Sequence, residues 1–136
     1  MKVTLDTNVL ISTTFWYGDS NKIIERVERK EIEMVLSGEI IEEFAKVLEY
    51  KDIKEKVKGI NIEMNRVIEK IFSLSTIVYP NEKLDVVKDD PDDNKVLECA
   101  KAGNVDFIVT SDNHLLKLKD FEGIRIMTPK EFMTMI

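Results

Sequence analysis

The sequence predicts an α/β fold in which helices cover both faces of a parallel β-sheet. Short apolar runs typical of strands alternate along the chain with longer amphipathic segments typical of helices. Such an alternation requires crossover connections, which make the strands parallel and place helices over the sheet. The chain has 136 residues, a length that suits one hydrophobic core, so we expect a single domain over residues 1–136.

The predicted strands are short apolar runs, and two of them lead directly to an aspartate. The first runs into Asp6, and a later one ends in the sequence Val109-Thr110-Ser111-Asp112. The predicted strands are Lys2–Leu5, Glu33–Leu36, Thr76–Tyr79, Asp106–Val109 and Ile124–Met127.

The helices are predicted from amphipathic periodicity and from start signals. The clearest is Gly38–Tyr50, for which Ser37 is a suitable N-cap. Pro91 fits the first position of a later helix, which makes Asp90 its natural N-cap, and Thr128 opens the last helix. The predicted helices are Lys22–Lys30, Gly38–Tyr50, Asp52–Lys58, Asn61–Ser73, Pro91–Ala102, Asn113–Leu118 and Pro129–Met135.

Composition excludes several classes of protein. No apolar run is long enough to span a bilayer, and Asp6 and Asn8 interrupt the only candidate region for a signal peptide. Cys99 is the only cysteine, which excludes an internal disulfide and a thiolate zinc site. We therefore expect a cytoplasmic protein. The net charge of −6 means that any RNA binding must rely on a local basic patch or on bound metal ions.

Asp6 and Asp112 follow two strands of the predicted sheet. Because the ligand site of an open parallel sheet lies beyond the carboxyl ends of its strands, both side chains should reach the same edge. Taken singly, each aspartate is more simply explained as the cap of the following helix. The acids on the helices decide between these two interpretations.

The helix Gly38–Tyr50 carries three glutamates that differ in orientation. Its apolar stripe places Glu42 nearly opposite and Glu39 well away, so both should be solvated. Glu43 borders the stripe and should point toward the sheet, where an unpaired acid is costly.

The acidic segment before Val96 gives a second such case. Asp93 lies on the apolar face of its helix, one turn before Leu97, whereas Asn94 should point away. Asp93 could instead complete a capping box with Asp90. Asp92 lies between the two faces and is a candidate supporting residue.

Asp6, Glu43, Asp93 and Asp112 are therefore expected to aim at one region from four separate elements. Such a cluster repels itself unless some members stay protonated or a cation compensates. An all-carboxylate site favours Mg²⁺ or Mn²⁺, and the absence of a Cys/His set disfavours zinc.

The residues around these acids resemble the four motifs of the PIN-domain family, in the same order and over nearly the whole chain. Within that family the resemblance is to prokaryotic toxin components of toxin–antitoxin systems, the VapC-like endoribonucleases. The four segments are Leu5-Asp6-Thr7-Asn8-Val9-Leu10, Ser37-Gly38-Glu39-Ile40-Ile41-Glu42-Glu43-Phe44, Asp90-Pro91-Asp92-Asp93-Asn94-Lys95-Val96-Leu97 and Val109-Thr110-Ser111-Asp112.

The resemblance implies a three-layer α/β/α fold with about five parallel strands, and an endoribonuclease that hydrolyses single-stranded RNA with Mg²⁺ or Mn²⁺. It also implies a homodimer and an antitoxin protein as a partner. Carried over residue by residue, the metal-binding and catalytic acids are Asp6, Glu43, Asp93 and Asp112. Asn8 and Thr110 would support them through hydrogen bonds.

Three other features are open to more than one interpretation. Phe15, Trp16 and Tyr17 are placed in a loop after the first motif, where Trp16 and Tyr17 would stack on bases of the substrate. They would equally cover the core or a partner surface, an interpretation that we favour slightly. His114 is expected to be a surface residue, and Cys99 a small buried one.

Several other functions remain to be distinguished. An enzyme that matures ribosomal or transfer RNA, a flap-type DNA nuclease, or a PIN binding module without catalysis would share much of this pattern. A phosphatase of the haloacid dehalogenase type is disfavoured because Asn8 stands where a second aspartate is usual. A response-regulator receiver is disfavoured because the required adjacent acidic pair is missing.

Overall fold

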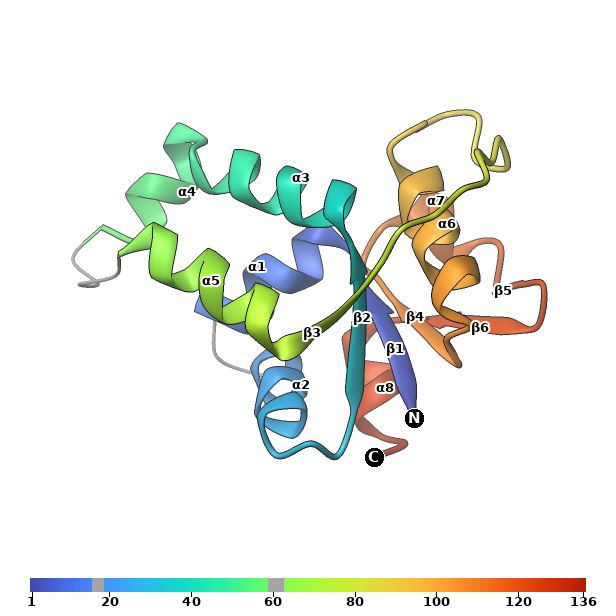
Figure 1. The fold of residues 1–136 in the computed structure, drawn as a ribbon, viewed down its shortest axis with the longest axis horizontal. Helices are drawn as coiled ribbons and strands as arrows, with labels where there is room; N and C mark the ends of the chain where they lie inside the picture. Colours follow the sequence, from blue (N-terminus) through green and yellow to red (C-terminus); the bar gives the residue numbers. More distant parts are fainter. Residues whose placement is uncertain (16–18, 59–62) are drawn as a thin grey trace.

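The fold is built on a six-stranded β-sheet with the strand order β3-β2-β1-β4-β6-β5. The computed structural model describes residues 1–15, 19–58 and 63–136 (Figure 1), so Trp16 and Tyr17 lie outside the described residues. The strands are β1 (Lys2–Leu5), β2 (Glu33–Ser37), β3 (Ser75–Val78), β4 (Phe107–Val109), β5 (Asp120–Phe121) and β6 (Ile124–Met127).

Five of these strands are parallel, as the alternation of elements predicts. The exception is β5, which pairs with β6 in an antiparallel hairpin. It was not predicted, because a strand of two residues is too short to carry a periodic pattern.

The strand order places a crevice at the centre of the sheet. From β1 the chain continues outward through β2 to β3, and it then returns to pair β4 with the other side of β1. The register sets Leu5 opposite Val109, and the Asp6 amide donates to the Val109 carbonyl oxygen over 3.2 Å. The carboxyl ends of β1 and β4, each followed by an aspartate, therefore flank the point where the winding direction changes.

Helices cover both faces of the sheet, with α6 on one side and α3 and α5 on the other (Figure 1). None of the helices among the described residues has the length and apolar character that a bilayer crossing requires. The helices are α1 (Thr7–Phe15), α2 (Asp19–Glu28), α3 (Gly38–Leu48), α4 (Lys51–Lys56), α5 (Met64–Leu74), α6 (Asp93–Gly103), α7 (Asn113–Leu116) and α8 (Pro129–Met133).

Helix α1 corrects the loop predicted after the first motif. Val9, Leu10 and Ile11 are all buried, although consecutive helical positions point in different directions. The helix is enclosed on more than one side, because it packs against both α2 and α3. It therefore lacks the polar face that makes a helix recognisable by its periodicity.

Two helix starts follow the predicted capping chemistry. The Ser37 hydroxyl accepts a hydrogen bond from the Ile40 amide over 3.3 Å at the start of α3. Thr128 and Glu131 form a reciprocal capping box at the start of α8.

The start of α6 differs from the prediction in two respects. The helix begins at Asp93 and not at Pro91, and the Asp90 carboxylate accepts from the Asp92 amide in a preceding turn (3.2 Å) instead of capping the helix.

Asn94, predicted to point away from the core, is buried. Its Oδ1 accepts from the amides of Val86 and Val87 (2.9 Å each), and its Nδ2 donates to the Val87 carbonyl (2.8 Å). Asn94 thus fastens the preceding loop to α6, because these backbone groups would otherwise be unpaired.

The core is one continuous cluster that includes residues from both ends of the chain, such as Val3 and Phe132. At Gly103, the last residue of α6, the helix lies close to the sheet, because a Cβ there would lie 2.5 Å from Cγ1 of Val35 on β2. Cys99 on the same helix is fully buried, as predicted, and burial raises the pKa of its thiol to about 11.

Candidate metal centre

The predicted acids meet in one small pocket beyond the ends of β1 and β4. Asp6 follows β1, Glu43 lies on α3, Asp93 begins α6 and Asp112 follows β4. The pocket has a volume of about 110 Å³, and the same residues appear in its wall. Its lining consists of Asp6, Thr7, Asn8, Glu43, Val47, Asp90, Asp92, Asp93, Val96 and Asp112.

Asp6 is held in place at both of its carboxylate oxygens. Oδ1 accepts from the Val9 amide over 2.9 Å, and Oδ2 accepts from the hydroxyl of Thr110. Asp6 is only 6% exposed, and this burial raises the pKa of its carboxyl group to about 6. The hydrogen bonds from Thr110 and Val9 act in the opposite direction, because they stabilise the carboxylate.

Asp93 is buried to a similar degree as Asp6, but fewer hydrogen bonds stabilise its carboxylate. The residue is 8% exposed, and its Oδ2 atom has no hydrogen-bond partner among the described residues. Burial, followed by the charges of Asp112 and Asp90, raises the pKa of Asp93 to about 7. A buried oxygen without a partner is costly, so this atom calls for a cation or a proton.

Glu43 and Asp112 form the more exposed side of the pocket. The hydroxyl of Thr7 donates to Glu43 Oε2 over 3.0 Å and so directs this carboxylate. Asp112 Oδ1 accepts from the His114 amide over 2.7 Å, so Asp112 also caps α7. The capping interpretation of Asp112 and its position in the pocket are therefore compatible.

The predicted supporting residues occupy different places. Thr110 is fully buried and bridges two acids, because its hydroxyl donates to Asp6 and accepts from the Asp112 amide over 3.0 Å. Asn8 and Asp92 are exposed in the wall of the pocket, and Asp92 pairs with Lys95 at 3.2 Å.

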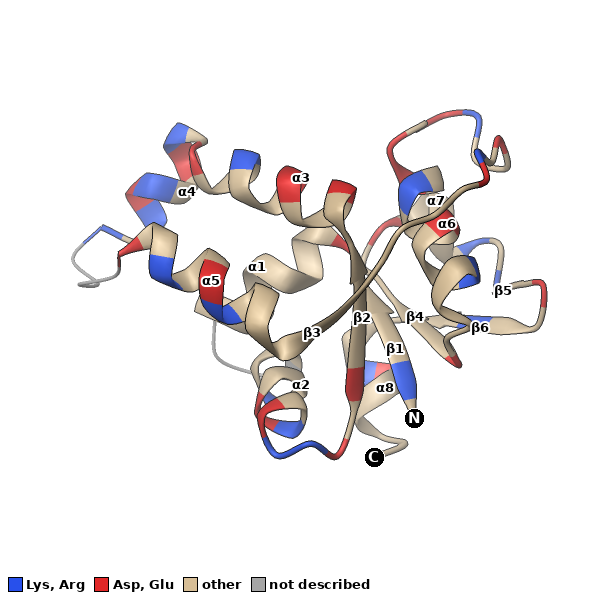
Figure 2. Cartoon of the chain, viewed as in Figure 1, with Lys and Arg blue, Asp and Glu red and all other residues tan. Residues whose placement is uncertain are grey.

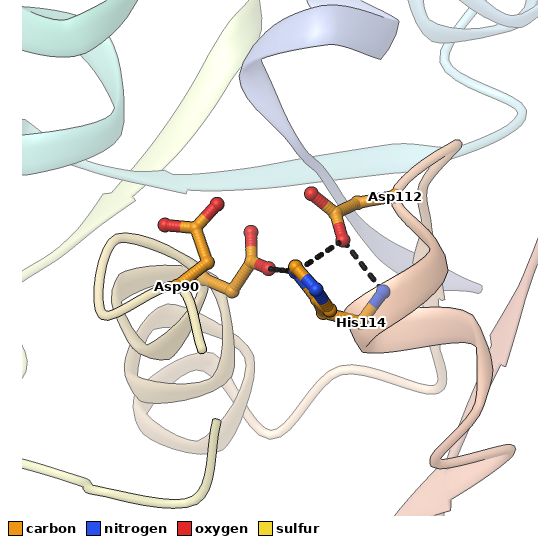
Figure 3. A group of neighbouring side chains, drawn as sticks. Asp90, Asp112 and His114 are labelled. Carbon is orange, nitrogen blue, oxygen red and sulfur yellow. Dashed lines mark hydrogen bonds and ion pairs between the residues drawn. The ribbon is translucent and has the colours of Figure 1, made fainter. Parts of the chain in front are cut away.

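Two residues at the site were missed from the sequence, namely Asp90 and His114. One ligand atom from each of Asp90, Asp93, Asp112 and His114 lies within 4.8 Å of the others. His114 Nδ1 is 3.8 Å from Asp93 Oδ2 and 3.6 Å from Asp112 Oδ1 (Figure 3). His114 is therefore not a plain surface residue, although its side chain is 40% exposed. Its spacing of two residues from Asp112 was the available signal.

The residues present fit a hard divalent cation. Carboxylate oxygens are the ligands that Mg²⁺ and Mn²⁺ prefer, and Asp93 Oδ2 is a buried oxygen with no partner among the described residues. A cation would also favour the ionised forms of Asp6 and Asp93, whose pKa values burial raises.

Comparisons with known proteins identify the family and the fold. The family model described as PIN domain matches residues 2–114. None of the curated proteins matches the sequence. A solved structure of VapBC2 from Rickettsia felis, bound to a DNA fragment from their promoter, is similar in fold, with a TM-score of 0.59 and 15% sequence identity. The alignment covers 93% of this chain and 97% of that one.

Proposed function

The chain belongs to the PIN-domain family of nucleases, and from this premise we propose that it is an endoribonuclease that hydrolyses single-stranded RNA with Mg²⁺ or Mn²⁺. The observation that carries the proposal is the convergence of Asp6, Glu43, Asp93 and Asp112 on one pocket. These four acids are the proposed metal-binding and catalytic residues. The proposal treats residues 1–136 as one domain.

Each acid of the pocket has a distinct role in this proposal. Asp6 and Asp93 would anchor the cation, because they are the most buried of the four acids. The hydrogen bonds to both oxygens of Asp6 fix its orientation and still leave a lone pair on each oxygen. Glu43 and Asp112 complete the site from its open side, where the substrate enters.

A bound divalent cation supplies a more acidic water and positive charge opposite the phosphate oxygens. Thr110 holds Asp6 and the Asp112 backbone in one arrangement, which would preorganise this part of the site for the reaction. Hydrolysis by water leaves a 5′-phosphate and a 3′-hydroxyl. A ribonuclease that uses paired histidines would instead leave a cyclic phosphate, and the chain has one histidine.

A cleft beside the pocket supports a nucleic acid as the substrate. It has a volume of about 520 Å³ and shares Glu43 and Asp92 with the pocket. Its lining combines four acids, which are Glu39, Glu42, Glu43 and Asp92, with three lysines from separate segments and one exposed tyrosine. The three lysines and the tyrosine suit phosphates and an unpaired base. Those residues are Lys46, Lys83, Lys95 and Tyr50.

The lysines of this cleft bear on how a chain with a net charge of −6 would bind RNA. Figure 2 shows basic and acidic residues interspersed over α3, α4 and α5. Binding of an anionic polymer would therefore depend on the local lysines and on the cation and not on the field of the whole protein.

The proposed biological role is that of the toxin in a toxin–antitoxin pair. The similar fold of a Rickettsia felis protein solved as VapBC2 supports an antitoxin protein as the partner. Homodimerisation and a cytoplasmic location remain part of the proposal. The alternative roles are maturation of ribosomal or transfer RNA, cleavage of DNA flaps, and binding without catalysis.

The proposal is tested by incubating the purified chain with end-labelled structured and unstructured RNA in Mn²⁺, Mg²⁺ or EDTA. We expect cleavage of the unstructured RNA only with metal, with 5′-phosphate ends. Asp6→Asn should abolish it, whereas Asp52→Asn, an exposed aspartate on α4, should not. Cleavage that survives both EDTA and Asp6→Asn, or cyclic phosphate ends, would contradict the proposal.

A further inference from the structure

We propose that His114 is a direct ligand of the metal centre and gives it a preference for Mn²⁺ over Mg²⁺. This inference rests on the proposed cation site but not on RNA as the substrate. It concerns a nitrogen ligand that none of the four acidic motifs supplies. The main observation behind it is that His114 Nδ1 lies between the carboxylates of Asp93 and Asp112 (Figure 3).

The distances around His114 Nδ1 suit a shared ion better than direct hydrogen bonds. Nδ1 lies 3.8 Å from Asp93 Oδ2 and 3.6 Å from Asp112 Oδ1, and both distances are too long for a hydrogen bond. Octahedral ligands about 2.1 Å from an ion lie about 3.0 Å apart when adjacent and about 4.2 Å apart when opposite. Both measured distances fall within that interval, and the ligand atoms of the whole group lie within 4.8 Å of one another, so a modest adjustment would let the three atoms share one ion.

Asp93 provides independent support for a ligand at this position. Its Oδ2 is a buried oxygen that has no hydrogen-bond partner in the described part of the chain, and it lies 3.8 Å from His114 Nδ1. Buried carboxylate oxygens without partners are rare because they are costly. An ion between Asp93 and His114 would satisfy this oxygen from the side that faces the imidazole.

The backbone prepares His114 for this role. The His114 amide donates to Asp112 Oδ1 over 2.7 Å, so the start of α7 is fixed by one of the proposed ligands. Asp112 Oδ1 thus holds the backbone of the residue whose side chain faces it. Asp90 lies on the opposite side of the group, and its ligand atom is within 4.8 Å of the other three. A small rotation of this half-buried side chain would bring it into the same coordination sphere.

The chemistry of the nitrogen ligand predicts the preference between cations. Mg²⁺ binds oxygen ligands almost exclusively and retains its waters, whereas Mn²⁺ and later transition metals bind imidazole more readily. Carboxylates alone discriminate weakly between Mg²⁺ and Mn²⁺. One imidazole added to such a set should therefore strengthen Mn²⁺ binding selectively.

The test measures metal binding to the full chain without substrate. Calorimetry with MnCl₂ and MgCl₂ should show that His114→Gln weakens Mn²⁺ binding about tenfold and changes Mg²⁺ binding by less than about twofold. Pulsed electron paramagnetic resonance of bound Mn²⁺ should detect nitrogen coupling in the natural chain and lose it in His114→Gln. Asn113→Ala changes the exposed residue next to His114, so it is the matched control and should retain the nitrogen coupling.

The outcomes separate this inference from the proposed function. Mn²⁺ binding without nitrogen coupling, or an equal loss of Mn²⁺ and Mg²⁺ affinity in His114→Gln, would overturn the role of His114. In that case the loss of Mn²⁺ binding in Asp93→Asn would still support the carboxylate site. If the natural chain bound neither ion, the proposed function would fail together with this inference. Thermal unfolding of each variant would identify any that had lost its fold.

Discussion

The hydroxyl of Thr110 donates a hydrogen bond to Asp6 Oδ2 and thereby joins the ends of two adjacent strands, β4 and β1, that lie far apart in the sequence. The same hydroxyl accepts from the Asp112 amide. One buried side chain thus aligns two of the acids in the pocket, and it also lowers the pKa of Asp6 against the effect of burial.

Thr110→Val should therefore weaken the metal centre without changing its acids. Valine has nearly the same shape but cannot donate, so the pKa of Asp6 should rise further and Mn²⁺ affinity should fall about tenfold or more. Calorimetry and a carboxyl NMR titration would measure the two effects. Thr110→Ser restores the hydroxyl and is the control. Unchanged Mn²⁺ affinity in Thr110→Val would show that the bond has no part in metal binding.

The stability of the metal-free protein should fall as the pH rises from about 4 to about 7. Burial raises the pKa values of Asp6 and Asp93 from 3.8 to about 6 and about 7, so the folded state binds these protons more tightly than the unfolded state. The resulting stabilisation is present below the unfolded pKa and is lost as the pH passes the folded values.

Urea denaturation after metal removal would measure this loss, which we expect to be on the order of 6 kcal/mol for the two groups together. Saturating Mn²⁺ at pH 7 should recover much of it, because the cation stabilises the carboxylates. Asp93→Asn should show a smaller fall and little recovery. Stability that stays constant or increases over this pH interval would contradict the burial argument.

The lysines of the cleft beside the pocket should affect substrate binding more than the chemical step. In the double variant Lys46→Gln and Lys83→Gln we expect KM to rise about tenfold with little change in kcat. For single-stranded RNA, each lost phosphate contact should also reduce the salt dependence of binding by about 0.7 in the log–log slope. The double variant Lys22→Gln and Lys130→Gln, on α2 and α8, is the control with the same charge change. A lower kcat at unchanged KM would place these lysines outside the binding surface.

Gly103→Ala should destabilise the fold although alanine normally favours helices. Its Cβ would lie 2.5 Å from Cγ1 of Val35, a buried β-branched side chain with little room to move. We expect a loss of about 1–3 kcal/mol in the free energy of unfolding. Gly38→Ala is a matched control, because nothing lies within 4 Å of its added Cβ.

The double variant Gly103→Ala and Val35→Ala should lose less free energy of unfolding than the sum of the losses in the two single variants. The reason is that Val35→Ala removes the methyl group with which the new Cβ would clash. Thermal or urea unfolding of the four proteins would provide this double-mutant cycle. Additive effects of the two substitutions would show that the close approach of α6 to β2 does not constrain residue 103.

The sequence was most informative where a polar pattern and a hydrophobic pattern coincide. Glu43 could be separated from Glu42 because it borders the apolar stripe of α3, and it does lie in the pocket wall while Glu42 is exposed. Asp6 and Asp112 could be placed together because parallel strands end at one edge of a sheet.

Other features required the three-dimensional contacts. Helix α1 is enclosed on several sides and so shows no clear periodicity, and α6 begins later than Pro91 suggested. The burial of Asn94 depends on the loop that it fastens, which no periodic pattern describes. His114 could not be assigned to the site because its neighbours Asp93 and Asp112 come from different elements.

The pairing of β1 with β4 also has a consequence for the timing of synthesis. A nascent chain that has emerged from the ribosome only as far as Tyr79 already contains the strands β1, β2 and β3, but it lacks the partner that flanks β1 on its other side. Asp93 and Asp112 are then still untranslated or inside the exit tunnel. A chain that has emerged only this far therefore carries two of the four acids of the pocket, so the proposed metal centre would form only after β4 has left the exit tunnel.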